Sequence, residues 1–307
     1  MKSLIIICLL ISPFVLSQNV QFVNQSMDSI HAKEIRSLFE DSKHNIWLST
    51  KSDGIYRLKD GQLQKMISTN TSVLSGFISA LEDEDGSIWF SARGVMKFKN
   101  DAVNILTEHD GVSSSVIFSI SKADDDTICF SGNRGTDCIS EKGIKKFNAT
   151  NGLKHQVVHD AKKDTLGQFW FATRKGGLNM VDDKGKWHYF LEGVNCRKLL
   201  KLKNGNLWIG TSTGAILLNI NTHTFTIIEK GFALIPQLES QDESVVFATE
   251  GHGVFVYAQQ TWKQFNAENS ILKCNVVHTI IEDVNQTLWM GFDKGFQVIK
   301  PSELYGN

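Results

Sequence analysis

The residues best suited to chemistry in this chain are arginines that precede recurring glycines by one to three positions. Arg93, Arg134 and Arg174 are spaced 41 and 40 residues apart. The planar fork of an arginine binds carboxylate, sulfate or phosphate through two parallel hydrogen bonds. If the fold brings these segments together, the pattern predicts a binding site for a small anion.

Seven such segments can be compared, one before each recurring glycine. Six of their fifteen residues are Lys or Arg, whereas the whole chain has 32 Lys and Arg in 307 residues. We predict that Lys51 and Lys294 join the arginines in a basic collar, meaning the Lys and Arg side chains of these seven turns. The alternative is that these are exposed turns, which are commonly charged without binding anything.

Further ligand contacts are expected where the chain enters the strands beside the collar. His155, Arg197 and Asn275 occupy such positions and carry hydrogen-bonding groups. His252 lies between two glycines and is the histidine we would test first. Any polar loop offers similar groups, so ordinary solvated side chains are the alternative here too.

The sequence does not indicate a metal site or a catalytic site of a kind that a short motif would reveal. The nine histidines are scattered, and no His, Cys or carboxylate cluster has ligand spacing, so neither a metal nor a cofactor is expected. Motifs for a serine nucleophile or a phosphate-binding loop are missing, so no catalytic residue is assigned. A formal net charge of −1 gives no reason to expect nucleic acid or an anionic membrane as partner.

The cysteines suggest one covalent link. A two-residue turn at Asn133 and Arg134 would place Cys129 directly opposite Cys138, at a separation that suits a disulfide. The alternative is that Cys129 only fills a core position. Cys196 and Cys274 fall in non-adjacent repeats and are expected to be free.

These candidates are arranged by a repeat. Five tryptophans stand between apolar neighbours, and two further segments match with the tryptophan replaced by Cys129 or Val246. The central positions are 47, 89, 129, 170, 208, 246 and 289, at intervals of 38 to 43 residues. Each is followed two positions later by a small residue, which indicates a close neighbour at that strand end. Four copies have an Asp six positions before the centre.

Each copy predicts four short antiparallel strands joined by glycine turns. Units of this size and content are typical of propeller blades. We therefore predict an all-β, seven-bladed β-propeller of four-stranded blades over residues 18–307. The last copy lacks a fourth strand, and residues 20–23 are expected to supply it, which would close the ring and remove a sheet edge.

Residues 1–17 read as a signal peptide, with Lys2 before an apolar run that Pro13 interrupts. The run is too short to cross a bilayer, and no second one follows. Export to the periplasm or beyond is expected.

The motif Leu207-Trp208-Ile209-Gly210-Thr211 resembles the two-component regulator propeller repeat, and the resemblance extends over nearly all of residues 18–307. It implies the extracytoplasmic sensing part of a membrane histidine kinase. This chain departs from that plan because its sequence contains no kinase region or membrane helix, so another protein would have to carry the signal.

Three functions follow as hypotheses. The leading one is a non-catalytic sensor for a small anionic or carbohydrate ligand, linked to two-component signalling and with a membrane histidine kinase as partner. The second is a propeller lyase or glycan-acting hydrolase that uses His155, His252 and the basic collar. The third is a scaffold for protein interaction.

Overall fold

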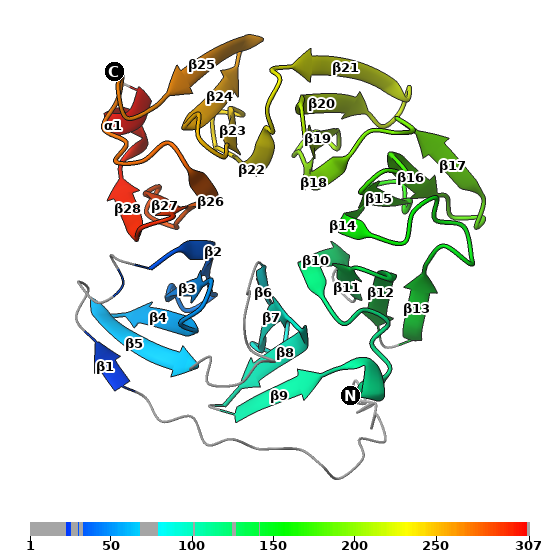
Figure 1. The fold of residues 1–307 in the computed structure, drawn as a ribbon, viewed down its shortest axis with the longest axis horizontal. Coiled ribbons are helices and arrows are strands. Elements are labelled where there is room, and N and C mark those ends of the chain that lie inside the picture. The colour runs from blue at the N-terminus through cyan, green and yellow to red at the C-terminus, as the bar shows by residue number, and fades with distance from the viewer. Residues whose placement is uncertain are drawn as a thin grey trace, which may run out of the picture.

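The computed structural model describes residues 23–25, 30, 33–67, 79–100, 102–124, 127–140 and 142–305. They form a ring of antiparallel sheets around a central axis (Figure 1). The predicted signal peptide, residues 1–17, lies outside the described residues. The prediction of an all-β propeller with seven blades is confirmed.

The innermost and second strands of the blades run in chain order. The inner strands are β2 (Ile35–Glu40), β6 (Ala80–Glu82), β10 (Ile117–Asp124), β14 (Val158–Lys163), β18 (Cys196–Lys201), β22 (Ile235–Glu239) and β26 (Val277–Glu282). The second strands, which contain the repeat centres, are β3 (Ile46–Thr50), β7 (Ile88–Ala92), β11 (Thr127–Gly132), β15 (Phe169–Thr173), β19 (Leu207–Thr211), β23 (Val245–Ala248) and β27 (Leu288–Phe292).

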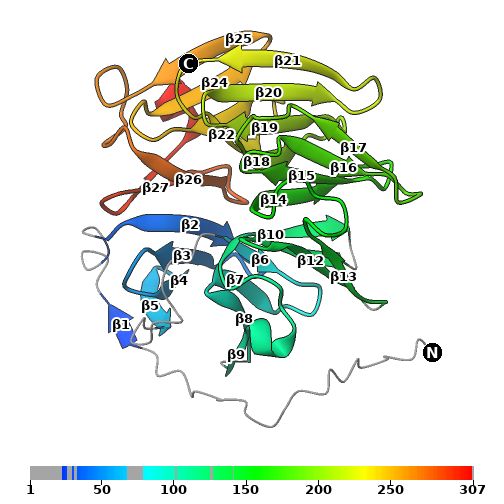
Figure 2. The same cartoon turned by 45° about the vertical axis from the view of Figure 1, so that its right-hand side comes forward.

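The remaining strands step outward from the axis, as β18 to β21 do in Figure 2. The third strands are β4 (Ile55–Lys59), β8 (Gly94–Lys99), β12 (Gly135–Ser140), β16 (Leu178–Val181), β20 (Gly214–Asn219), β24 (Val254–Ala258) and β28 (Phe296–Ile299). The outer strands are β5 (Gln62–Ile67), β9 (Ala102–Leu106), β13 (Gly143–Phe147), β17 (Trp187–Phe190), β21 (Thr224–Glu229) and β25 (Thr261–Phe265). Short helices follow β9 (η2, Glu108–Asp110) and β28 (α1, Pro301–Tyr305).

The apolar core lies between the blades. Each of seven clusters of buried side chains is shared by two adjacent blades, and together they cover all seven interfaces of the ring. Trp170 and Trp208 are among the largest fully buried side chains. Because each blade is covered on both faces, its second strand is apolar at successive positions and does not alternate.

The N-terminal strand lies elsewhere than expected. Strand β1 (Val23–Gln25) pairs with β5 on the outer edge of the first blade, with Val23 opposite Lys65. The last blade has three strands among the described residues, and residues 20–22 lie outside them. Closure of the ring by residues 20–23 is therefore not shown.

Side-chain packing joins the last blade to the first. Phe296, Trp289 and Ile281 pack against Leu48 and Tyr56 in one of the seven clusters. At the same junction the Gly295 N–H donates to the Lys33 carbonyl over 2.7 Å. Because hydrophobic contact is not directional, apolar side chains of the two blades can pack together even where no strand is shared between them.

The aspartates six positions before the centre hold the tryptophans. The indole Nε1–H donates to Asp Oδ2 in four blades, over 2.7 Å from Trp47 to Asp41, and likewise in the pairs Trp89–Asp83, Trp170–Asp164 and Trp289–Asp283. The Oδ1 atom of Asp41 accepts hydrogen bonds from the backbone of the following turn. Burial opposes the ionisation of Asp41, but these hydrogen bonds outweigh it and lower its pKa.

We expect Asp41→Ala to lower the free energy of unfolding by roughly 2–4 kcal/mol, because a buried indole N–H and turn amides lose their charged acceptor. Urea unfolding at pH 7 measures this, with the exposed Asp183→Ala as a near-neutral control. Since the pKa of Asp41 is lowered, its contribution is present above about pH 4 and is lost as the pH falls through the folded-state pKa. Equal stability of the two variants would contradict this role.

The third blade carries the disulfide expected from the register. Cys129 of β11 lies opposite Cys138 of β12 across the turn at Asn133 and Arg134. The two residues form a disulfide with their Cα atoms 4.0 Å apart. Cys196 and Cys274 are free.

We expect removal of this disulfide in Cys129→Ala/Cys138→Ala to cost about 2–3 kcal/mol of stability, because the unfolded chain loses a short covalent loop. Unfolding with and without reductant measures the loss. The double variant serves as the control, since reductant should leave its stability unchanged. Two free thiols in unreduced peptides of the native protein would refute the link.

Candidate functional site

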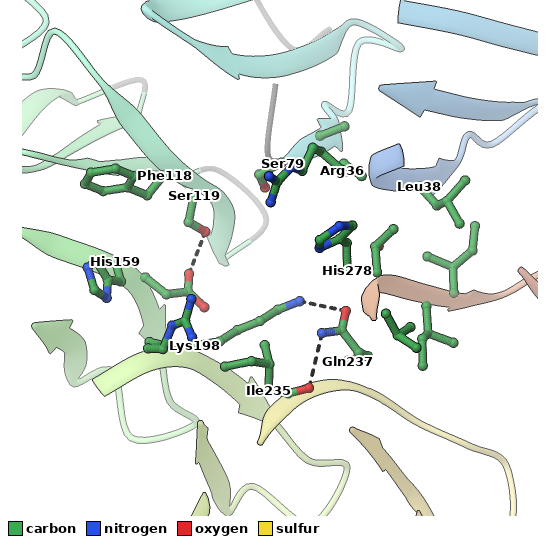
Figure 3. A pocket seen from close by; sticks show the side chains of 18 of the residues that line it. Arg36, Leu38, Ser79, Phe118, Ser119, His159, Lys198, Ile235, Gln237 and His278 are labelled. Carbon is green, nitrogen blue, oxygen red and sulfur yellow. Dashed lines mark hydrogen bonds between the residues drawn. The ribbon is translucent and has the colours of Figure 1, made fainter. Parts of the chain in front are cut away.

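A pocket of about 690 Å³ lies on the ring axis, where the inner strands of all seven blades converge (Figure 3). Its lining includes Arg36 of β2, Phe118 of β10, His159 of β14, Lys198 of β18 and His278 of β26. The volume is within the range of small-molecule sites. Side chains from every blade therefore reach one cavity.

A β-bulge directs many of these side chains toward the axis. Six of the seven inner strands shift register by one residue relative to the second strand, and in each the extra residue lines the pocket. These residues are Arg36, Phe118, His159, Arg197, Gln237 and His278. A bulge leaves its extra residue outside the ladder and turns its side chain. The same local irregularity thus supplies one pocket residue from each of six blades.

The next residue along most inner strands forms a second ring of side chains. It pairs with the small residue of the second strand and also lines the pocket, as with Ser37, Ser119, Asp160, Lys198 and Thr279. At Gly210, opposite Lys198, an added Cβ would lie 2.6 Å from Pro236 Cδ of the next blade. The small residue is needed because the adjacent inner strand passes close by, as the sequence indicated.

The pocket carries more basic than acidic groups. Its lining contains Arg36, Lys51, Arg197 and Lys198, against the carboxylates of Asp160 and Glu250. Arg197 pairs with Glu250 over 3.0 Å, so it is largely balanced. Arg36 and Lys51 both pair with Glu34, just outside the lining, so the basic groups exceed these three carboxylates by one charge. A net positive charge in a concave, partly desolvated site favours an anionic ligand.

Burial lowers the pKa of His159, an effect that the hydrogen bond of its Nδ1 with the Cys196 carbonyl opposes and that the charges of Arg197 and Arg174 strengthen. The ring also contacts Phe118 edge-on. His159 is therefore neutral at pH 7. A donating Nδ1–H leaves Nε2 as a hydrogen-bond acceptor.

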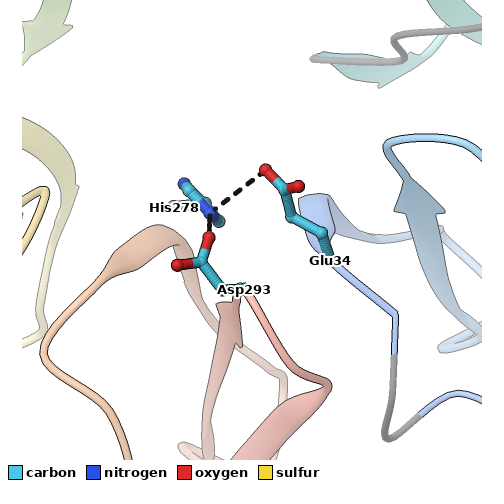
Figure 4. Close-up of side chains that lie close together, drawn as sticks. All are labelled: Glu34, His278 and Asp293. Atoms are coloured by element: carbon cyan, nitrogen blue, oxygen red, sulfur yellow. Dashed lines mark hydrogen bonds and ion pairs between the residues drawn. The ribbon is translucent and has the colours of Figure 1, made fainter.

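Glu34, His278 and Asp293 meet where the last blade joins the first (Figure 4). His278 Nε2 lies 2.7 Å from Asp293 Oδ1 and 3.6 Å from Glu34 Oε1. A His with two carboxylates could hold a cation. However, Arg36 and Lys51 each form an ion pair with a Glu34 oxygen, which satisfies that carboxylate. The group is better described as an ion-pair network beside the pocket.

The structure places some of the predicted ligand contacts in the pocket and the others outside it. Lys51 and Arg197 line the pocket, whereas the other predicted residues lie outside its lining, namely Arg93, Arg134, Arg174, Lys294, His155, His252 and Asn275. Arg134 pairs with Glu108, and His252 stacks on Phe232 with ring centroids 3.8 Å apart. Of the six Lys and Arg side chains of the basic collar, Lys51 alone is in the lining of this cavity.

Local hydrogen bonds engage two other predicted residues. His155 Nδ1 accepts from the Val157 N–H, and Asn275 Oδ1 accepts from the Ala267 N–H. The residues that sequence reasoning missed, among them Arg36, His159, Lys198 and His278, lie inside the inner strands. A signal was present: the second or third residue of each inner strand is often polar within an otherwise apolar segment.

Comparisons with known proteins agree with this architecture. No protein-family model matches the sequence. Histidine kinase P4 of Formosa agariphila is 25% identical over 322 aligned residues, which cover 90% of this chain and 22% of that protein. The chain thus spans under a quarter of this curated relative.

Solved structures show the same fold. The extracellular domain of the putative hybrid two component system BT3049 from B. thetaiotaomicron has a TM-score of 0.76 and 18% identity, covering 91% of this chain and 42% of that one. Virginiamycin B lyase from Staphylococcus aureus has a TM-score of 0.67 and 12% identity, covering 91% and 98%. The predicted resemblance to propellers of two-component systems is confirmed. In the described part of the chain, no helix is long and apolar enough to cross a membrane.

We expect Arg174→Gln to raise the pKa of His159, because a nearby positive charge that disfavours the imidazolium is removed. An NMR titration of the histidine Cε1–H signals measures it. Arg93→Gln on another blade is the matched control and should leave the value unchanged. The same shift in both variants would argue against a local charge effect at His159.

Proposed function

We propose that this chain is an exported, non-catalytic sensor propeller that binds a small anionic or carbohydrate ligand in its axial pocket. The observation that carries the proposal is the convergence of bulged inner-strand side chains on one cavity with excess basic charge. Bulges that re-aim side chains are common next to functional sites.

The lining suits an acidic sugar. Arg36 and Lys198 offer charge to a carboxylate or sulfate. Ser37, Ser119 and Thr279 offer hydroxyl groups that can bond to sugar hydroxyls, and Phe118 supplies an aromatic surface. A ligand with an anionic group and several hydroxyls would use all three kinds of contact.

Two comparisons support a link to signalling. A histidine kinase aligns with 90% of this chain, and an extracellular domain of a two-component system shares its fold. The disulfide between Cys129 and Cys138 supports export, since such bonds persist in oxidising compartments. We propose that ligand occupancy is passed to a membrane histidine kinase.

A second candidate is a lyase acting in the same pocket. His159, with its pKa lowered and Nε2 available as acceptor, would be the general base. Virginiamycin B lyase has the same fold as this chain, which supports this second candidate. Conversion of a bound ligand to product, lost in His159→Gln with binding retained, would favour it over a sensor.

We expect uronic-acid oligosaccharides or sulfated sugars to raise the melting temperature of the purified chain. Arg36→Gln should weaken binding of the best ligand roughly 10- to 100-fold, because one charge-assisted hydrogen bond is worth about 1.5–3 kcal/mol. Thermal-shift screening followed by calorimetry measures both effects.

Arg93→Gln, outside the pocket lining, is the matched control and should bind normally. If no acidic or neutral sugar in the panel stabilises the protein, the proposed ligand class is wrong. If Arg36→Gln and Arg93→Gln weaken binding equally, the ligand binds elsewhere than in the axial pocket.

A further inference from the structure

Lys198 stands out among the pocket residues because its side chain is half-buried and its amine has few polar partners. Among the described residues, its one hydrogen bond runs from Nζ to Gln237 Oε1 over 3.2 Å (Figure 3). Gln237 Nε2 donates to the Ile235 carbonyl, which turns the amide oxygen toward the amine. A lysine ammonium has three donors. Two of them therefore remain for a ligand in the cavity.

The nearby carboxylate is committed elsewhere. Asp160 Oδ1 accepts from Ser119 Oγ over 2.7 Å and from the Ala161 N–H over 2.9 Å, while Oδ2 accepts from the Leu199 N–H over 3.0 Å. In the described part of the chain no carboxylate forms an ion pair with Lys198. The Asp160 carboxylate thus links its own strand to the two neighbouring inner strands, and the Lys198 amine has no ion-pair partner among these residues.

This environment makes the neutral amine more accessible than it is in an ordinary lysine. Burial lowers the pKa of Lys198 to about 8, with the charge of Asp160 opposing the effect and that of Lys162 adding to it. An ordinary lysine has a pKa of about 10.4 and is almost wholly protonated at neutral pH. Desolvated lysines of this kind are nucleophiles toward carbonyl groups.

We propose that Lys198 forms a reversible imine with the aldehyde group of a small carboxylic acid bound in the axial pocket. The inference rests on the proposed function in placing an acidic ligand there. Open-chain uronic sugars belong to this class, as they carry an aldehyde and a carboxylate. Arg36 lines the same cavity, and its guanidinium has donors beyond the one that pairs with Glu34, so it is suited to bind the carboxylate.

The reaction needs no oxidant or reductant. The Nζ lone pair adds to the carbonyl carbon, and the carbonyl oxygen takes up a proton to give a carbinolamine. The hydroxyl group then leaves as water while nitrogen loses its remaining proton, so amine and aldehyde give imine and one water. Hydrolysis reverses the step and keeps the ligand exchangeable.

The test uses glyoxylate, a minimal acid with an aldehyde, and sodium cyanoborohydride, whose hydride reduces the imine to a stable secondary amine. Peptide mapping of the purified chain should find the adduct mainly on Lys198. Its labelling should reach half its maximum near pH 8, because addition requires the neutral amine, whereas exposed lysines should respond near pH 10.

Lys198→Arg retains the charge and should lose this adduct, while Lys201→Arg, at an exposed position on the same strand, should retain it. Lys198→Met is a second variant in case arginine disturbs the fold, and circular dichroism checks both. Label spread evenly over exposed lysines, or unchanged total labelling in Lys198→Arg, would overturn the proposal.

The two proposals fail separately. Sugar acids that stabilise the protein without any adduct on Lys198 would overturn the imine and leave the sensor standing. A specific glyoxylate adduct on Lys198, with no acidic or neutral sugar stabilising the protein, would support the reactive amine and overturn the sugar ligand. Glycolate, which has a hydroxyl group in place of the aldehyde, should give no adduct in either case.

Discussion

Burial of apolar side chains between neighbouring blades is the interaction on which this structure depends. A single four-stranded blade exposes two apolar faces and cannot bury either alone. Each of the seven clusters covers one face of two blades, so the ring leaves no blade uncovered. The second strand lies between two such clusters, and in four blades its tryptophan is further oriented by an aspartate from the preceding turn.

The ring geometry determines what can happen at the axis. Inner strands converge there, and the small residues at the ends of the second strands, such as Gly210 and Gly291, let adjacent blades approach closely. Bulges in six of the seven inner strands then free one side chain each from the ladder and direct it into the pocket. The apolar clusters that hold the blades together lie farther out, between the sheets.

The junction of the last and first blades lies next to this pocket. His278 lines the cavity and also contacts Glu34 and Asp293, while Arg36 joins the cavity to the same network. The described part of the junction is held by packing and a few polar contacts, with no strand shared across it. A ligand that bound Arg36 or His278 would therefore act directly on the closing interface, a route by which occupancy could reach a partner.

The sequence alone determined the blade count, the strand order within a blade and the pairing of Cys129 with Cys138, because these depend on local periodicity and turn geometry. The sequence also located the small residue two positions after each repeat centre and indicated that a neighbouring strand lies close to it. Tertiary structure decided the rest. A polar residue at the second or third position of an inner strand is a local signal, but whether it faces the axis depends on a one-residue bulge and on the convergence of seven distant strands. The sequence therefore found Lys51 and Arg197 but missed Lys198 and His159, and the pairing of β1 with β5 joins segments too far apart in the chain for a local pattern to predict.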